Sequence, residues 1–143
     1  MTASGESEGA DLAGILISVA RKITVRADED PGFVSLTQLE GLVMRHIDKH
    51  PGITPSQLAA DVRLKTSNAS AALRSLESKG FITREADARD RRAVHIHPTR
   101  LAADNLQRLR RVWDSLLSPH LTDPVATTAA VAFLTRLDDS LTS

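Results

Sequence analysis

The sequence contains no cysteine, and its 143 residues carry no net charge. Without cysteine there are no disulfides, no thiol nucleophile and no cysteine-based sensing of oxidants. No uninterrupted apolar run approaches the ~20 residues that a membrane-spanning helix needs, and residues 1–10 lack the apolar segment of a signal peptide. A Gly-rich phosphate loop and a recognisable pair of catalytic carboxylates are also missing. These absences predict a cytoplasmic protein that is not an enzyme, needs no cofactor and has no membrane partner.

Charge is distributed unevenly along the chain even though it sums to zero. Residues 61–111 carry 12 lysines and arginines against 6 acidic residues, whereas residues 1–60 carry 5 against 8 and residues 112–143 carry 1 against 4. A neutral protein is a poor general partner for nucleic acid, but a basic segment gathered on one part of a fold is typical of DNA binding. The alternative is that this segment is only a solvated face.

Two short helices with a tight connection are predicted in the middle of the chain. Thr54 suits the N-cap of the first helix, and Pro55 suits its first position, where a missing N–H costs nothing. The second helix is predicted from Thr66 to Lys79, and Gly80 follows where a C-terminal cap needs positive φ. One face of this second helix is apolar at helical spacing, and consists of Ala69, Ala72, Leu73 and Leu76. The opposite face carries short side chains and one cation, so it can approach another surface closely.

After Gly80 the apolar period changes from 3.6 to 2, which predicts a half-buried hairpin over residues 81–84 and 93–97. The connection, residues 87–92, lacks glycine, so a longer exposed loop with three arginines is favoured over a two-residue turn. A helix-turn-helix followed by a basic hairpin is the outline of a winged helix.

Four further helices are predicted, over residues 11–25, from Ser35 or Thr37 to Lys49, and over residues 99–117 and 124–141. The fold class is therefore mainly α with a small β-hairpin wing (α+β), with residues 1–10 as a disordered tail. The helices 11–25, 99–117 and 124–141 have more apolar surface than one small wing domain can cover, which indicates a partner chain. The alternative is a private bundle core in a monomer.

Four motifs, in this order and spacing, occur in a known family. They are Leu36-Thr37-Gln38-Leu39, Pro51-Gly52-Ile53-Thr54-Pro55-Ser56-Gln57-Leu58-Ala59, Leu73-x-x-Leu76-Glu77-x-Lys79-Gly80-Phe81-Ile82-x-Arg84 and Asp87-x-Arg89-Asp90-Arg91-Arg92-Ala93. With them the chain strongly resembles the multiple antibiotic resistance regulator (MarR) family of transcription factors. The resemblance implies a winged helix-turn-helix domain over residues 35–98, with a helical dimerisation region formed by residues 11–34 and 99–143.

The function implied is that of a homodimeric repressor bound to a pseudo-palindromic operator in double-stranded DNA. A two-fold axis would place the two recognition helices at half-sites roughly 10 bp apart. The resemblance also implies that a small aromatic anionic ligand relieves repression. The chain departs from the family at Ala71, where a longer side chain is common, and at Pro98, after which the family's usual Leu-Thr and glycine are absent. These departures affect the preferred sequence and the wing orientation rather than the fold.

The helix predicted from Thr66 to Lys79, taken as the recognition helix, supplies the first candidate contacts with DNA. Asn68 suits a bidentate contact with adenine, and Arg74 reaches guanine or phosphate. Thr66, Ser67 and Ser70 suit phosphate or water-mediated contacts. Lys65 lies beside the helix N-terminus, which also favours a phosphate. By resemblance, base contacts come from the positions of Ser67, Asn68, Ser70 and Ala71.

The wing supplies the second group. We expect Arg89 and Arg91 to contact DNA, and Asp90 to brace the tip together with Arg92, although these roles are exchangeable among the arginines. An ordinary charged hairpin tip is the alternative.

Histidines offer a rival chemistry, because His46 and His50 lie four apart on a helix and His95 and His97 lie two apart on a strand. Each pair needs a third ligand to hold a metal. The sequence thus leaves open a metal-responsive regulator and a winged-helix protein–protein interaction module without DNA readout.

Overall fold

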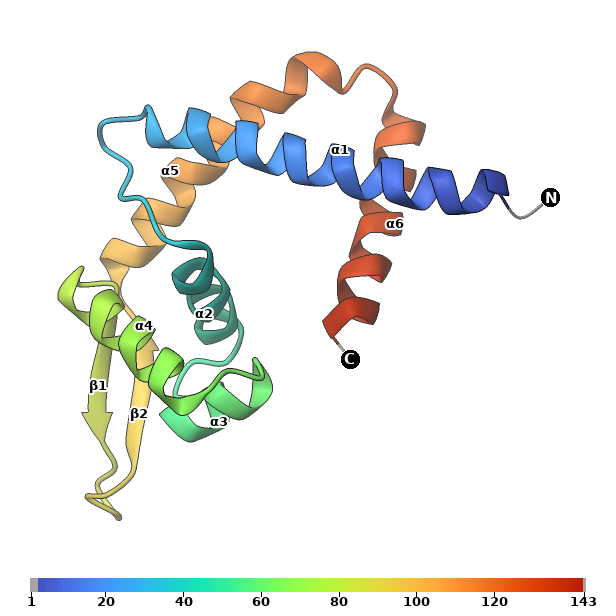
Figure 1. The fold of residues 1–143 in the computed structure, drawn as a ribbon. Coiled ribbons are helices and arrows are strands. Elements are labelled where there is room, and N and C mark those ends of the chain that lie inside the picture. Colours follow the sequence, from blue (N-terminus) through green and yellow to red (C-terminus); the bar gives the residue numbers. More distant parts are fainter. Residues whose placement is uncertain (1–2, 143) are drawn as a thin grey trace. The chain divides into compact units, whose positions relative to one another are not determined.

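A computed structural model of the chain describes the backbone of residues 3–142 and the side chains of residues 7–141. The elements run in the order α1 (Ala3–Asp28), α2 (Gln38–Lys49), α3 (Pro55–Asp61), α4 (Thr66–Ser78), β1 (Ile82–Ala86), β2 (Val94–Pro98), α5 (Arg100–Leu117), η1 (Ser118–His120) and α6 (Pro124–Thr142), as Figure 1 shows. The fold is mainly helical with one hairpin, so the predicted class is confirmed. Every predicted helix is present, and all but the first lie within a few residues of their expected bounds.

The N-terminal tail is the clear exception. The sequence predicted disorder over residues 1–10, but α1 begins at Ala3. That prediction is therefore wrong for residues 3–10, while residues 1 and 2 lie outside the described residues. Once the amphipathic segment from residue 11 has formed a helix, each added residue gains a backbone hydrogen bond without a new nucleation cost. The helix therefore extends through a stretch that has no apolar pattern of its own.

Two compact units make up the chain, one formed by Val25–Leu109 and the other by Met1–Thr24 with Arg110–Ser143. We call the first the winged unit and the second the helical unit. The winged unit is wider than the predicted DNA-binding domain of residues 35–98. Val34 and Asn105 explain part of this extension, because they exchange hydrogen bonds of 2.8 and 3.1 Å between the α1–α2 connection and α5.

Local sequence signals fix the helix boundaries in the winged unit. Thr37 caps α2 and Thr54 caps α3, each through a reciprocal capping box with the side chain three residues later. These boxes satisfy backbone donors that have no partner inside the helix. Gly80 follows α4 with a φ of 76°, the left-handed conformation predicted for it.

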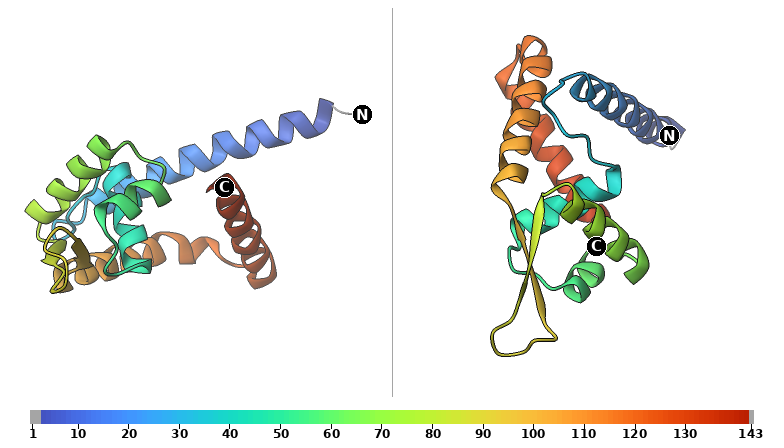
Figure 2. Two further views of the ribbon diagram at one scale, coloured as in Figure 1. Left: turned by 90° about the horizontal axis from the view of Figure 1, so that it is seen from below. Right: turned by 90° about the vertical axis from the view of Figure 1, so that its left-hand side faces the viewer.

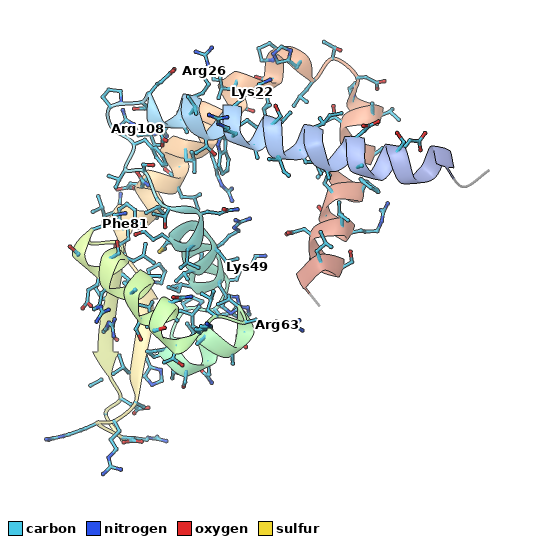
Figure 3. All side chains as sticks on the ribbon, viewed as in Figure 1. Lys22, Arg26, Lys49, Arg63, Phe81 and Arg108 are labelled. Atoms are coloured by element: carbon cyan, nitrogen blue, oxygen red, sulfur yellow. The ribbon has the colours of Figure 1, made fainter. Side chains whose placement is uncertain are left out.

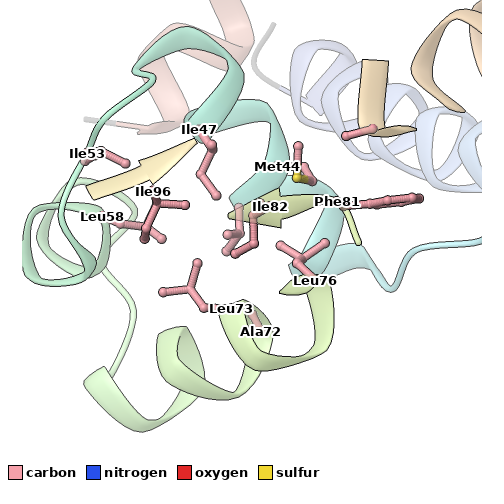
Figure 4. Close-up of a cluster of buried hydrophobic side chains, with 12 residues drawn as sticks. Met44, Ile47, Ile53, Leu58, Ala72, Leu73, Leu76, Phe81, Ile82 and Ile96 are labelled. Carbon is pink, nitrogen blue, oxygen red and sulfur yellow. The ribbon is translucent and has the colours of Figure 1, made fainter. Parts of the chain in front are cut away.

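A single apolar core holds α2, α3, α4 and the hairpin together (Figure 4). Its fully buried side chains come from every one of these elements and from the turn after α4, and include Val43, Ile47, Leu58, Leu73, Leu76, Phe81 and Ile96. β1 and β2 pair antiparallel, with Arg84 opposite Ile96, and β2 also bridges to Ile53 before α3. The hairpin is thereby anchored at its base, while its tip projects away from the helices of the winged unit (Figure 2).

The helical unit has a different character. None of its described side chains, from residues 7–24 and 110–141, is buried. Large apolar side chains stand exposed on α1 and α6, including Ile15, Ile17, Val19, Val125, Val131, Phe133, Leu134 and Leu141. Among the described residues, no helix combines the length and apolarity that crossing a membrane requires. The described residues of this unit therefore form no buried core of their own.

Candidate nucleic-acid interface

The outer face of α4 is exposed and built from small polar side chains. Lys65, Thr66, Ser67, Asn68 and Arg74 are exposed, and Ser70 is partly exposed. All six residues predicted at this helix are thus at least partly accessible. The buried face consists of Ala69, Ala72, Leu73 and Leu76, as the periodicity predicted. Short side chains let a helix backbone come close to base edges in a major groove.

The first turn of α4 is closed by a hydrogen bond of 3.0 Å from the Asn68 N–H to the Lys65 carbonyl oxygen. Lys65 occupies the N-cap position, and no side chain caps the helix there. The turn before it contains Arg63, whose φ of 52° is the only positive value at a non-glycine residue in the described chain. Arg63 is exposed in the connection between α3 and α4 (Figure 3). Uncapped N–H groups beside a lysine form a local positive site suited to a phosphate.

The wing tip is ordered by its two aspartates through the backbone. Asp87 accepts a hydrogen bond of 2.8 Å from the Arg89 N–H, and Asp90 accepts one of 3.0 Å from the Arg92 N–H. The side chains of Arg89, Arg91 and Arg92 are exposed. Asp90 therefore holds the Arg92 backbone instead of its guanidinium, which leaves the wing arginines directed at solvent.

A second brace on the wing was not foreseen from the sequence. His95 lies with Nε2 3.1 Å from an Asp87 carboxylate oxygen and with Nδ1 2.8 Å from the Gly52 carbonyl oxygen. The hydrogen bond to Asp87, followed by the one to Gly52, raises the pKa of His95. The Arg89 backbone hydrogen bond, followed by the His95 contact, lowers the pKa of Asp87. This bridge ties the wing loop to the turn before α3.

Some of the basic residues between positions 61 and 111 form ion pairs, and others do not. Lys79 contacts Glu40 at 2.7 Å, and Arg84 contacts Glu77 at 3.1 Å. Arg100 contacts Asp104 at 3.7 Å. By contrast, no described carboxylate forms an ion pair with the cations predicted to contact DNA, which are Lys65, Arg74, Arg89, Arg91 and Arg92. Arg63 before α4 and Arg110 and Arg111 on α5 also form no ion pair with a described carboxylate. The unpaired positive charge in this segment therefore includes the N-cap and outer face of α4 and the wing tip but is not confined to them.

The histidines do not converge on a metal centre. His46 Nε2 lies 2.9 Å from an Asp61 carboxylate oxygen and His97 Nε2 lies 3.7 Å from Glu85, so both have acidic partners. Within the described part of the chain, no group of three or more histidines and carboxylates has the arrangement to hold a metal ion.

An exposed helix of short side chains beside a basic two-stranded hairpin defines a winged helix-turn-helix protein of the DNA-binding class. A model of the MarR family matches residues 36–94, which run from the residues before α2 to the start of β2. No curated protein matches the chain. The likeness to the MarR family model therefore covers 59 of the 143 residues, which include α2, α3, α4 and β1.

Solved structures extend the likeness beyond that segment. A structure of MarR shares 25% identity with this chain, covering 91% of it and 96% of MarR at a TM-score of 0.66. Streptococcus pneumoniae FabT, solved in complex with DNA, shares 23% identity over 95% of this chain and 96% of its own at a TM-score of 0.73. A mutant of S. aureus MepR bound to an oligodeoxyribonucleotide shares 21% identity over 91% and 97% at a TM-score of 0.62.

Proposed function

We propose that the protein is a homodimer that binds a pseudo-palindromic operator in double-stranded DNA and represses transcription. The observation that supports this proposal best is the exposed outer face of α4, with Lys65 at its N-cap and Arg74 on it, beside a wing tip that carries three exposed arginines. In this proposal residues 35–98 form the DNA-binding domain, and residues 11–34 and 99–143 form the dimerisation region. FabT and MepR, which share the fold, were solved with DNA.

The two parts of the interface have different roles in this proposal. α4 lies in the major groove, where Asn68 contacts adenine and Arg74 contacts guanine or phosphate. Lys65, Thr66, Ser67 and Ser70 position the helix on the phosphates. At the wing, Arg89, Arg91 and Arg92 approach the adjacent minor groove, while Asp90 holds their loop in shape.

Fragments of the native genome selected by the purified protein would test this function. We expect the bound fragments to share an inverted repeat whose half-sites lie roughly 10 bp apart, because one recognition helix of each protomer reads one half-site. Fragments that share no motif, bound with salt dependence alone, would contradict sequence-specific regulation. The remaining interpretation would then be a basic winged-helix protein that does not recognise a DNA sequence.

The apolar side chains of the helical unit support the homodimer. A unit without a single buried described residue cannot be stable by apolar burial within one chain. A second copy supplies the same exposed α1 and α6 surfaces, and isologous pairing of such surfaces is the common form of a two-fold dimer.

Dimerisation is tested by placing a charge on α6. Phe133→Asp changes a side chain that is 43% exposed, and Leu42→Asp on α2 of the winged unit changes one that is 41% exposed. Sedimentation should find Phe133→Asp monomeric or unfolded and Leu42→Asp dimeric, because only the former lies in the helical unit. A wild-type protein that sediments as a monomer at operator-binding concentrations would refute the dimer.

Relief of repression by a small aromatic anion is the part of the proposal that rests on the family alone. A benzoate series added to the selected operator complex is the direct test. We expect one or more of these anions to lower operator affinity without changing the sedimentation of the dimer. Unchanged affinity across the series would remove this ligand class from the proposal.

A further inference from the structure

Glu40 is the only buried charged side chain among the described residues, with 5% of its surface exposed. It is the third residue of α2 and belongs to the Thr37 capping box. Its Oε2 accepts hydrogen bonds from the Thr37 backbone N–H at 3.0 Å and from Lys79 Nζ at 2.7 Å. Its Oε1 accepts a short hydrogen bond from the Ser75 hydroxyl. Three donors, one from the N-cap of α2 and two from the C-terminal end of α4, therefore converge on one carboxylate.

Capping alone does not explain this burial. Gln57 fills the equivalent third position of α3, where its side chain accepts from the Thr54 backbone N–H at 3.1 Å and is exposed. A capping box thus works at the surface of this same protein. Burying a carboxylate is costly unless hydrogen bonds compensate it. Glu40 therefore serves a purpose beyond the N-terminus of α2.

The ionised form of Glu40 is the one that the structure holds. Burial raises the pKa of Glu40, but the hydrogen bonds from Lys79, Ser75 and the Thr37 backbone together bring it below its ordinary value. Charge-assisted hydrogen bonds are stronger and more directional than apolar contacts. No described side-chain donor or acceptor in the interior is left without a partner.

Both side-chain donors lie at the C-terminal end of α4, Ser75 within the helix and Lys79 at its C-cap. The rest of the buried face of that helix is apolar, with two alanines, Ala69 and Ala72, beside Leu73 and Leu76. Apolar burial is non-directional. The small residues on this face therefore determine how closely the helices pack, but they do little to fix where α4 lies along its own axis. The Glu40 contacts set that position, and Lys79 also reaches the Ser35 carbonyl oxygen at 3.4 Å. α4 is thereby fixed to the N-terminus of α2 at the end remote from Asn68.

We propose that Glu40 is a positioning residue for sequence readout, which fixes the axial position of α4 through Ser75 and Lys79 so that its outer face meets the base edges in register. This inference rests on the proposed function, in which α4 reads the major groove. Glu40 is buried and cannot touch DNA itself. Its loss should therefore lower discrimination between sequences more than it lowers general attraction to DNA.

The experiment compares full-length variants on two probes. One probe is a 30-bp duplex selected by the wild-type protein from random sequence, and the other is a scrambled duplex of the same composition. Glu40→Ala removes the acceptor, Glu40→Gln retains an acceptor and the capping box, and Lys79→Met removes the charged donor from α4. Glu77→Ala is the matched control, because it removes a half-exposed carboxylate from the same end of α4 that pairs only with Arg84.

We expect Glu40→Ala and Lys79→Met to reduce the affinity ratio between the two probes by about tenfold, within the range that a misplaced base contact costs. The slope of affinity against salt should stay at the wild-type value, because no phosphate contact is lost. Glu40→Gln should restore most of the ratio, and Glu77→Ala should leave it unchanged. Hydrogen exchange of the α4 backbone should quicken in Glu40→Ala and not in Glu77→Ala.

Two results would overturn the inference. One is that folded Glu40→Ala or Lys79→Met keeps the wild-type ratio of affinities for the two probes. The other is that these variants lose affinity for both probes equally. Lys79→Met keeps the measurement decisive should Glu40→Ala fail to fold. If the wild-type protein itself does not distinguish the two probes, the proposed function is refuted. Failure of the proposed function can therefore be told apart from failure of the role proposed for Glu40.

Discussion

Removal of a wing arginine should change how salt affects DNA binding more than it changes sequence preference. Arg89, Arg91 and Arg92 are exposed, and no described carboxylate pairs with their guanidinium groups. The loop that carries them is held by backbone hydrogen bonds to Asp87 and Asp90. Arg91→Ala therefore removes charge without removing a contact that shapes the tip.

The magnitude follows from counterion release. If each protomer neutralises about four phosphates, the log of the binding constant of the dimer should fall against log salt with a slope of roughly −7. Arg91→Ala acts in both protomers and removes two of those contacts. The slope should become shallower by about 1.8, and all sequences should weaken alike.

Fluorescence anisotropy at several salt concentrations, on the selected duplex and on a scrambled one, measures this change. Arg26→Ala is the control, because it removes an exposed arginine near the end of α1 that pairs with Glu29 at 3.4 Å. The control should keep the wild-type slope. Wild-type affinity and slope in Arg91→Ala would show that the wing does not bind the DNA backbone.

Three further outcomes follow from individual side chains. Asn68→Ala should lower discrimination at one operator position by about 1–3 kcal/mol and leave the salt slope intact, and binding to single-base operator variants measures it. Because the pKa of His95 is raised and that of Asp87 is lowered, the contact between them should stabilise the fold fully between about pH 4 and 6.5, and less as pH rises through the folded pKa of His95. The difference in Tm between wild type and Asp87→Asn should therefore shrink from pH 6 to 9. A difference in Tm that stays constant over this range would contradict a stabilising contact between His95 and Asp87. Arg63→Gly should stabilise the protein by about 0.5–1 kcal/mol in denaturant unfolding, because relief of the left-handed φ outweighs the entropy cost of glycine. Equal or lower stability would show that Arg63 is unstrained.

Local signals in the sequence were sufficient for most of the fold. Thr37 and Thr54 at helix starts, Gly80 at a helix end and the change of period after it placed the winged elements within a few residues. These features act between near neighbours in the chain, so they are readable without tertiary structure. The N-terminal end of α1 has no such signal, because its helix propagates from the segment that follows it.

The sequence predicted which residues of the candidate site are exposed, but not the hydrogen bonds that hold the site together. Exposure of Asn68 and Arg74 follows from helical periodicity, whereas the contacts that join distant segments do not. Glu40 meets Ser75 and Lys79 across more than thirty residues of sequence, and His95 meets Gly52 across more than forty. Only the Thr37-x-x-Glu40 spacing, a capping-box signature, hinted at one half of the Glu40 cluster.

Directed DNA cleavage from α4 tests the central claim most directly. The chain has no cysteine, so Ala71→Cys on the exposed face of α4 provides a unique attachment point for an iron chelate that cuts nearby DNA. If two protomers place α4 in successive major grooves, the selected operator should be cut at two symmetric positions roughly 10 bp apart. A single cut, uniform cleavage, or no cleavage of bound operator would contradict the account.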